Sequence, residues 1–340
     1  MKYKAKDIAK ELGVSPATIS LVINNKPGVG DEKRKEITKR IRELGCEYLL
    51  KDTIQNKGDI GLIIYKCSGK IINEYPFFNY LSESILGEVE KNGYSVKMMY
   101  LDKNMPLIER YQMLEEHRHA GYLVYAVEMY PEDMELFTRL RVPCVFMDNP
   151  MNTLNVDAVT VDNELGITQG FEYLYRMGHR RIGYIRSRVH IPCFDERFKA
   201  YCECMERKNL KVRDDFIMHV GYMESETETD VENYLDNCSE LPTAYLADND
   251  LLACRAVKSF KKKGILIPDE VSFVGFDNRP ICYFVEPNVS TIRLPGEEMG
   301  TIAVKALIDK IENDRKVFVK YKISPVLLEN ESVRKIMVIN

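Results

Sequence analysis

The sequence of 340 residues lacks most of the motifs that mark an enzyme. It has no tryptophan and only five histidines, none of which lies in a recognisable catalytic triad. No glycine-rich phosphate loop follows the first predicted strand, and neither a GxSxG elbow nor an HExxH motif occurs. An enzyme with an α/β body is therefore a remote alternative for this chain, and no catalytic residue is predicted.

Long apolar runs and paired cysteines are also absent. The chain has no apolar run of 18 residues and no N-terminal apolar segment of the signal-peptide kind, so we expect a cytoplasmic protein with no membrane span. Nine cysteines, an odd number without a CxxC pair, fit reduced thiols better than a disulfide framework. One cluster of potential ligands matches no standard zinc spacing, so we predict neither a metal site nor a cofactor; its members are His190, Cys193, Cys202 and Cys204.

The stretch Asp7–Pro27, DIAKELGVSPATISLVINNKP, predicts two short helices around a tight turn. Apolar residues recur at helical spacing before Gly13, which can adopt the left-handed conformation that ends a helix. Ser15 then supplies an N-cap oxygen, and Pro16 suits the first helical position because the N–H it lacks would be unpaired there. This pattern is typical of a helix-turn-helix, whose second helix lies in the DNA major groove. The inward face of that helix comprises Ile19, Val22 and Ile23.

A third amphipathic helix, expected over Asp31–Leu44 and ended by Gly45, completes a small all-α head. Residues 1–57 carry 13 Lys and Arg against 8 Asp and Glu, a net charge of +5. The remaining 283 residues carry 35 against 44, a net charge of −9. A basic head on an acidic body is the charge distribution that binding to DNA phosphates requires.

These motifs resemble the DNA-binding head of LacI/GalR family transcription regulators. The family pattern of KDVA, GVS-x-ATVS-x-VLNN and V-S-x-x-x-R is matched at Lys6–Ala9, Gly13–Asn25 and Val29–Arg34. The resemblance implies a transcription regulator, taken here as a repressor, that binds a pseudo-palindromic double-stranded DNA operator as a homodimer. The residues it implies at the DNA are Ser15, Pro16, Ala17, Thr18, Ser20, Leu21, Asn25 and Lys26.

From Asp59 onward, short β-branched runs alternate with helical stretches, which predicts two successive sets of parallel α/β units. Helices are expected between the strands, for example over Glu132–Leu140 and Val231–Cys238. The resemblance implies a two-lobed, periplasmic-binding-protein-like body of two doubly wound parallel sheets. We expect a head at 1–45, a hinge or linker at 46–58, a first lobe at 59–160 and 291–319, and a second lobe at 161–290 and 320–340.

A ligand site is expected at the carboxyl ends of the strands, in the cleft between the lobes. The resemblance implies a small-molecule effector there, a sugar or sugar derivative, and aromatic rings suit the face of a sugar or a base. Helix capping, turn formation or core packing is the structural alternative for several of the implied residues. The implied effector-binding residues are Phe77, Phe78, Asp162, Arg197, Asn249 and Asp277.

The head departs from the family pattern at its reading face and in its linker. Leu21 replaces a common arginine, so direct readout would depend on thymine methyl groups and phosphate contacts. The linker lacks the family's Ala-Arg-Ser-Leu run, whose leucine wedges into the minor groove. Residues that could replace this leucine are Leu49, Leu50 and Ile54.

One alternative stays open from the residues alone. The body could respond to a protein partner rather than to a small molecule. A change in DNA affinity caused by a small-molecule effector would distinguish the two.

Overall fold

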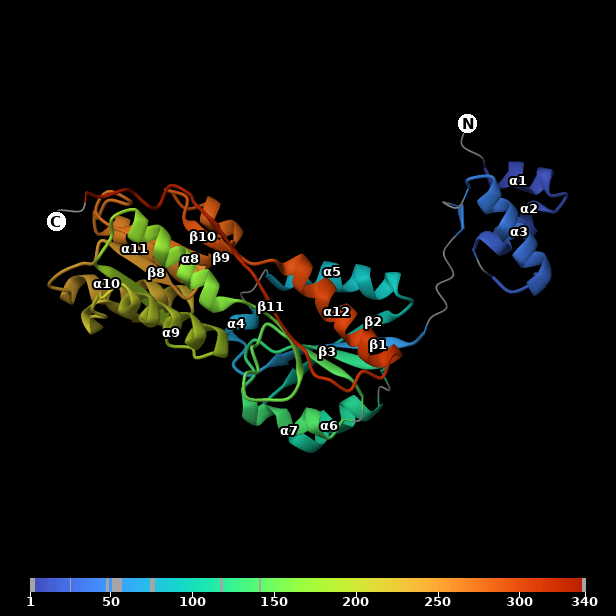
Figure 1. The fold of residues 1–340 in the computed structure, drawn as a ribbon, viewed down its shortest axis with the longest axis horizontal. Helices are drawn as coiled ribbons and strands as arrows, with labels where there is room; N and C mark the ends of the chain where they lie inside the picture. Colours follow the sequence, from blue (N-terminus) through green and yellow to red (C-terminus); the bar gives the residue numbers. More distant parts are fainter. Residues whose placement is uncertain are drawn as a thin grey trace. The chain divides into compact units, whose positions relative to one another are not determined.

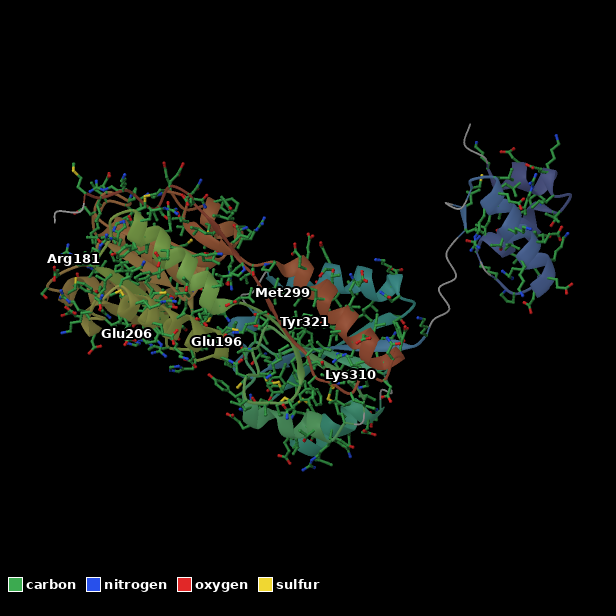
Figure 2. The ribbon with its side chains drawn as sticks, viewed as in Figure 1. Arg181, Glu196, Glu206, Met299, Lys310 and Tyr321 are labelled. Carbon is green, nitrogen blue, oxygen red and sulfur yellow. The ribbon has the colours of Figure 1, made fainter. Side chains whose placement is uncertain are left out.

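The computed structural model describes residues 4–24, 26–46, 49–50, 57–73, 77–116, 119–140 and 142–337. The chain forms two compact units, Met1–Lys57 and Gly58–Asn340 (Figure 1). Within the described residues, no helix is long and apolar enough to cross a membrane. All nine cysteines are free thiols, as the sequence predicts.

Three helices form the first unit: α1 (Ala5–Glu11), α2 (Pro16–Ile23) and α3 (Asp31–Glu43). Gly13 and Gly45 have φ angles of +61° and +64°, the left-handed geometry predicted for the residues that end α1 and α3. Ser15 caps α2 as predicted, because its Oγ accepts the backbone N–H of Thr18 at 3.0 Å. The buried side chains of the three helices form one small core, which contains Ile8, Ala9, Ile19, Val22, Ile37, Ile41 and Cys46.

The first sheet of the body has the strand order β11-β5-β4-β3-β1-β2, and all its pairs are parallel. Alternation along β1 sends Leu62 and Ile64 to the face covered by α5 and α12, and Ile63 and Tyr65 to the face covered by α6 and α7 (Figure 1). The strands are β1 (Asp59–Lys66), β2 (Ser95–Asp102), β3 (Gly121–Tyr125), β4 (Cys144–Met147), β5 (Asp157–Val161) and β11 (Lys320–Ile323). The helices are α4 (Lys70–Asn73), α5 (Phe77–Lys91), α6 (Leu107–Glu116), α7 (Glu135–Thr138) and α12 (Gly296–Glu312).

The second sheet has the order β12-β10-β9-β8-β6-β7, and only its β10–β12 pair is antiparallel among the described strands. Helix α8 packs against α9, and α10 packs against α11. The strands are β6 (Ile182–Ser187), β7 (Ile217–Val220), β8 (Ala244–Ala247), β9 (Ser272–Asp277), β10 (Ser290–Arg293) and β12 (Val326–Leu328). The helices are α8 (Asn163–Arg176), α9 (Pro192–Arg207), α10 (Glu224–Asn237) and α11 (Asp250–Lys262).

The chain crosses between the two sheets after β5, after β10 and after β11. The lobe boundaries predicted at 291 and 320 are wrong by a few residues. Strand β10 stays in the second sheet as far as Arg293, which pairs with Asp277 of β9. Strand β11 pairs with β5 in the first sheet over Lys320–Ile323. Both are short strands without a long β-branched run, so the sequence gives little sign of the sheet to which they belong.

Two predicted helices have different bounds in the structure. The segment expected as Glu132–Leu140 is a 3-10 turn, Pro131–Met134, followed by the single turn of α7. Helix α10 begins at Glu224 rather than Val231. The prediction missed its first half because that polar stretch, ESETETD, contains no apolar repeat to indicate a helix.

Candidate functional site

Helix α2 presents one buried side and one exposed side. Ile19 and Val22 lie in the core of the head, while the opposite side reaches solvent. Hydroxyl groups on that exposed side are suited to phosphate oxygens, and so is the ammonium of the exposed Lys26 after the helix. Of the residues predicted at the DNA, Ser15, Pro16, Ala17, Ser20 and Lys26 are exposed, Thr18 and Leu21 are partly buried, and Asn25 lies outside the described residues.

Arg34 of α3 fixes the C-terminal end of α2. Its guanidinium donates to the C=O of Leu21 at 3.5 Å and to the C=O of Lys26 at 2.5 Å. A Cβ added at Gly28 would lie 3.3 Å from Leu21 Cδ1, so the Leu21 side chain covers this turn. The sequence marked Arg34 only as part of a family motif, because its position in α3 gives no sign that it binds the end of α2.

Two of the linker residues proposed as a minor-groove wedge pack against the core of the head. Leu49 and Leu50 are partly buried against the core of the head, and the Leu49 N–H donates to the Cys46 C=O at 2.9 Å. Ile54 lies outside the described residues. The wedge role stays a prediction, and for Leu49 and Leu50 it requires that they leave this core.

Three charged side chains meet at the carboxyl end of the second sheet. Asp277 ends β9, and its Oδ1 lies 3.3 Å from Nη1 of Arg197 on α9. Its Oδ2 accepts from Nε of Arg279 at 3.2 Å. All three residues are buried. The structure therefore brings together the predicted Arg197 and Asp277 and adds Arg279, which no sequence motif had indicated.

Further hydrogen bonds hold the Arg197 guanidinium in one orientation. Its Nε donates to Asn163 Oδ1 at 2.9 Å, and its Nη1 donates to the Asp248 C=O at 2.6 Å. The guanidinium carbon lies 3.7 Å from the centre of the Phe276 ring, within cation–π range. Because Asn163 is the first residue of α8, this network connects the cluster to the first crossing between the lobes.

Asn249 and Asp162 both cap helices, and capping was the structural alternative given for Asn249. Asn249 Oδ1 accepts the Leu252 N–H at 3.2 Å at the start of α11, while its Nδ2 donates to the Tyr222 hydroxyl at 3.0 Å. Asp162 Oδ1 accepts the Leu165 N–H at 3.0 Å at the start of α8. One side-chain oxygen of each residue is therefore used in a helix cap, and effector contact by Asn249 or Asp162 stays a prediction.

Asp250 anchors the loop that carries Arg279. Its Oδ2 accepts the Arg279 backbone N–H at 2.7 Å, and its Oδ1 accepts the Thr291 hydroxyl at 2.6 Å. A Cβ added at Gly275 would lie only 2.2 Å from Asp250 Oδ1. A glycine is therefore required at this point of β9 so that the carboxylate can lie against the strand.

Asp148 faces this cluster from the first lobe. It follows β4, accepts from the Tyr125 hydroxyl at 3.3 Å through Oδ2, and offers its C=O to Cys193 Sγ of the second lobe at 3.2 Å. Burial raises the pKa of the Asp148 carboxyl to about 7, although Arg197 opposes this shift. Burial also raises the pKa of Asp248 and the pKa of Asp250 to about 7. Because Asp148 directly follows β4, the rule that places ligands at the carboxyl ends of strands could have indicated it.

The remaining predicted effector residues begin α5. This helix starts at Phe77, but the side chains of Phe77 and Phe78 lie outside the described part of the structure.

A cavity of about 340 Å³ opens beside Asp277 and Asn278, where the second and third crossings pass. This volume falls in the usual range for a small-molecule site. In the described residues, no group of three or more His, Cys, Asp or Glu side chains is placed to hold a metal ion.

Comparison with known proteins gives matches along most of the chain. Residues 4–47 match the family described as bacterial regulatory proteins, lacI family, and residues 171–333 match the periplasmic binding protein-like domain. The HTH-type transcriptional repressors PurR of Pasteurella multocida (strain Pm70) and Histophilus somni (strain 129Pt) are 26% and 28% identical to this chain. Each of these alignments covers 97% of this chain and 98% of the relative.

Solved structures show the same fold. A complex described as transcriptional regulator CelR with cellobiose has a TM-score of 0.73 at 21% identity, covering 97% of this chain and 99% of that chain. The lac repressor dimer bound to operator and the anti-inducer ONPF has a TM-score of 0.72 at 18% identity, covering 98% and 100%. These relatives and neighbours are transcriptional regulators, not enzymes. The chain therefore joins a helix-turn-helix domain of the lacI family of bacterial regulatory proteins to a periplasmic binding protein-like domain, and its homologues along 97% of its length are transcriptional repressors.

Proposed function

We propose that this repressor is a cytoplasmic homodimer that reads a pseudo-palindromic operator and is controlled by a small-molecule effector, a sugar or sugar derivative, bound between the two lobes of each body. The observation that carries the effector proposal is the buried cluster of Arg197, Asp277 and Arg279 at the carboxyl ends of the strands. A carboxylate held between two guanidiniums, with Asp148 facing it from the other lobe, is a polar arrangement suited to hydroxyl groups. The neighbour solved with cellobiose supports a carbohydrate.

Control of DNA binding would come from the relative pose of the lobes. The hydrogen bond from Cys193 to Asp148 joins the lobes across the cleft, and the Arg197–Asn163 bond reaches the first crossing. A ligand that binds one pose more tightly than another shifts the equilibrium toward it. Coupling of about 1–3 kcal/mol, or about 5–150-fold in operator affinity, is typical of such switches.

An exposed apolar region on the second lobe supports the homodimer. Phe284 is 86% exposed and lies beside a cavity of about 360 Å³, which Cys254, Ile281 and Val285 line together with charged residues such as Lys258. In a two-fold dimer each copy could place the same side chain against its partner. Phe284→Asp should therefore shift the protein toward monomer in sedimentation velocity and weaken operator binding. An unchanged dimer would place the interface elsewhere.

The operator proposal is tested by selection from random duplexes. We expect a two-fold motif with half-sites about one helical turn apart, and affinity that falls steeply as salt increases. The absence of any enriched motif, with or without the sugars and nucleosides tested below, would exclude sequence-specific binding.

The effector proposal is tested by thermal shift with sugars and nucleosides, followed by calorimetry on Asp277→Asn and on Arg197→Lys. A ligand that binds the native state raises Tm by mass action. Loss of a charge-assisted hydrogen bond is worth about 1.5–3 kcal/mol, so the ligand should bind each variant at least tenfold more weakly. Arg197→Lys keeps the buried positive charge and so limits the loss of folding stability. If no compound changes Tm or operator affinity, the alternative of a protein partner is favoured.

A further inference from the structure

Burial of carboxylates distinguishes this cleft from a phosphate-binding site. Among the described residues, four buried carboxyl groups lie around its centre, whereas two guanidiniums, those of Arg197 and Arg279, lie among them. A third buried guanidinium in this lobe, Arg255, donates to the Tyr222 C=O and lines the cavity beside Phe284. The four carboxyl groups belong to Asp148, Asp248, Asp250 and Asp277.

The guanidiniums at the centre already donate to internal acceptors. Arg197 donates to Asn163, to the Asp248 C=O and to Asp277. Arg279 donates from its side chain to Asp277 and to the Tyr222 hydroxyl. An anionic ligand would have to replace these partners while lying close to the remaining carboxylates. Removing the partner of a buried charge costs free energy, so this exchange is unfavourable.

The amide groups that follow β1 are also occupied by a carboxylate. Backbone N–H groups at the start of a helix after a strand commonly bind phosphate in α/β folds. Here the Glu128 carboxylate, 2% exposed, accepts four of them at 2.6–3.0 Å. The donors are the N–H groups of Cys67, Ser68, Gly69 and Ile71. Glu128 thus fills the place where a phosphate would gain most from the backbone.

Four cations near the carboxyl ends of the strands have an acidic partner. Lys70 of the first lobe lies 3.4 Å from Glu226 of the second, and Lys103 lies 2.8 Å from Asp133. Arg186 and Arg188, at the end of β6 and just beyond it, lie 3.1 Å and 2.6 Å from Asp195 and Asp230. These pairs add no net positive charge to the edge of the cleft.

We propose that the effector is an uncharged molecule rich in hydrogen-bond donors, without a phosphate or carboxylate group, and that the carboxyl groups of the cleft exclude its phosphorylated forms. The inference rests on the proposed function, because it concerns the ligand of the same cleft. Carboxylates and carbonyls accept hydrogen bonds from hydroxyl or N–H groups, whereas a phosphate offers mainly acceptors. The excess of carboxyl groups therefore selects for donors and against anions.

Matched pairs of ligands test this proposal on the full-length protein. Thermal shift and calorimetry at pH 8, above the pKa of about 7 of Asp148, Asp248 and Asp250, compare glucose with glucose 6-phosphate, ribose with ribose 5-phosphate, and adenosine with AMP. In a pair that binds, we expect the phosphate member to bind at least tenfold more weakly, which corresponds to about 1.4 kcal/mol. Tighter binding of a phosphate member would overturn the charge argument but leave small-molecule control intact. If no member of any pair binds, small-molecule control itself fails, and this inference fails with it.

A charge-neutralising variant tests the cause. Asp148→Asn should reduce the discrimination against the phosphate member at least threefold, because it removes one carboxylate that faces the ligand. Glu203→Gln on α9 of the second lobe, where Glu203 pairs with Lys199 at 3.5 Å, should leave the ratio within twofold of the parent. Asp248→Asn is the second variant if Asp148→Asn does not fold. A ratio unchanged in the folded variant would show that these carboxyl groups do not exclude anions.

Discussion

Gly275 lies where β9 approaches the carboxylate of Asp250, and this contact allows a specific test of the architecture of the site. A Cβ at Gly275 would lie 2.2 Å from Asp250 Oδ1 and 3.2 Å from its Cα. Asp250 cannot move away without losing the hydroxyl of Thr291 and the backbone N–H of Arg279. Gly275→Ala must therefore distort the strand or break these hydrogen bonds.

The expected cost follows from these two consequences. Overpacking a well-packed interior costs about 1–3 kcal/mol, and hydrogen bonds to a charged group are worth about 1.5–3 kcal/mol. We expect Gly275→Ala to lower the free energy of unfolding of the body by about 3–5 kcal/mol. Gly87→Ala is the matched control, because Gly87 lies inside α5 and an added Cβ would have no atom within 4 Å apart from its own stretch of helix. That change should stabilise the helix by about 1 kcal/mol.

Urea unfolding followed by tyrosine fluorescence measures both changes. The chain has no tryptophan, and 18 of its 20 tyrosines lie beyond residue 57, so the signal reports mainly on the body. Adding Asp250→Ala removes the atom that the new methyl group meets. The double variant should therefore lose less stability than the sum of the single variants, by about 1 kcal/mol or more. Two results would refute the close approach of Gly275 to Asp250. One is a free energy of unfolding for Gly275→Ala within about 0.5 kcal/mol of that for Gly87→Ala. The other is a double variant whose loss of stability equals the sum of the losses in Gly275→Ala and Asp250→Ala.

Three further changes test the head and the cleft. Leu21→Arg should add a guanine preference of about 1–3 kcal/mol in each half-site, measured by selection from random duplexes, and an unchanged motif would mean that α2 docks differently. Ser15→Ala removes the cap of α2 and should destabilise the head by about 0.5–2 kcal/mol in thermal unfolding followed by circular dichroism, with Ser20→Ala as the control. The pKa of Asp148 is about 7 in the folded protein, above the ordinary value of an aspartate, so the folded state holds an extra proton between about pH 4 and pH 7. The stability that this extra proton contributes is therefore lost as pH rises through this window. Because Asn does not titrate, the Tm of Asp148→Asn relative to that of the parent should increase from pH 5 to pH 8. A Tm difference that stays constant over this range would contradict the raised pKa.

The helix-turn-helix could be predicted almost completely because its signals are local. Gly13, Ser15 and Pro16 lie within four consecutive positions, and each acts on backbone groups within one or two turns of itself. Tertiary contacts added the parts that local spacing does not contain. Arg34, for example, reaches back to the carbonyl groups of Leu21 and Lys26 from a different helix.

Sequence patterns located part of the cleft through a rule about parallel sheets. Asp277 and Arg197 were expected at the carboxyl ends of strands, and the structure pairs them although 80 residues separate them. The rule did not indicate Arg279, whose side chain is held by the fold of the loop after β9. Nor did it indicate that Asp162 and Asn249 use their oxygens as helix caps.

By itself, the sequence determined the family, the two kinds of unit and the reading helix of a basic head, because propensity, capping and charge are written in neighbouring residues. Tertiary structure alone decided which lobe holds β10 and β11, since a short strand takes its place from the strand it pairs with. It also decided the electrostatics of the cleft. Asp148 becomes a carboxyl group with a pKa of about 7 only when the lobes bury it near Arg197 and Asp277, and no local pattern encodes that burial.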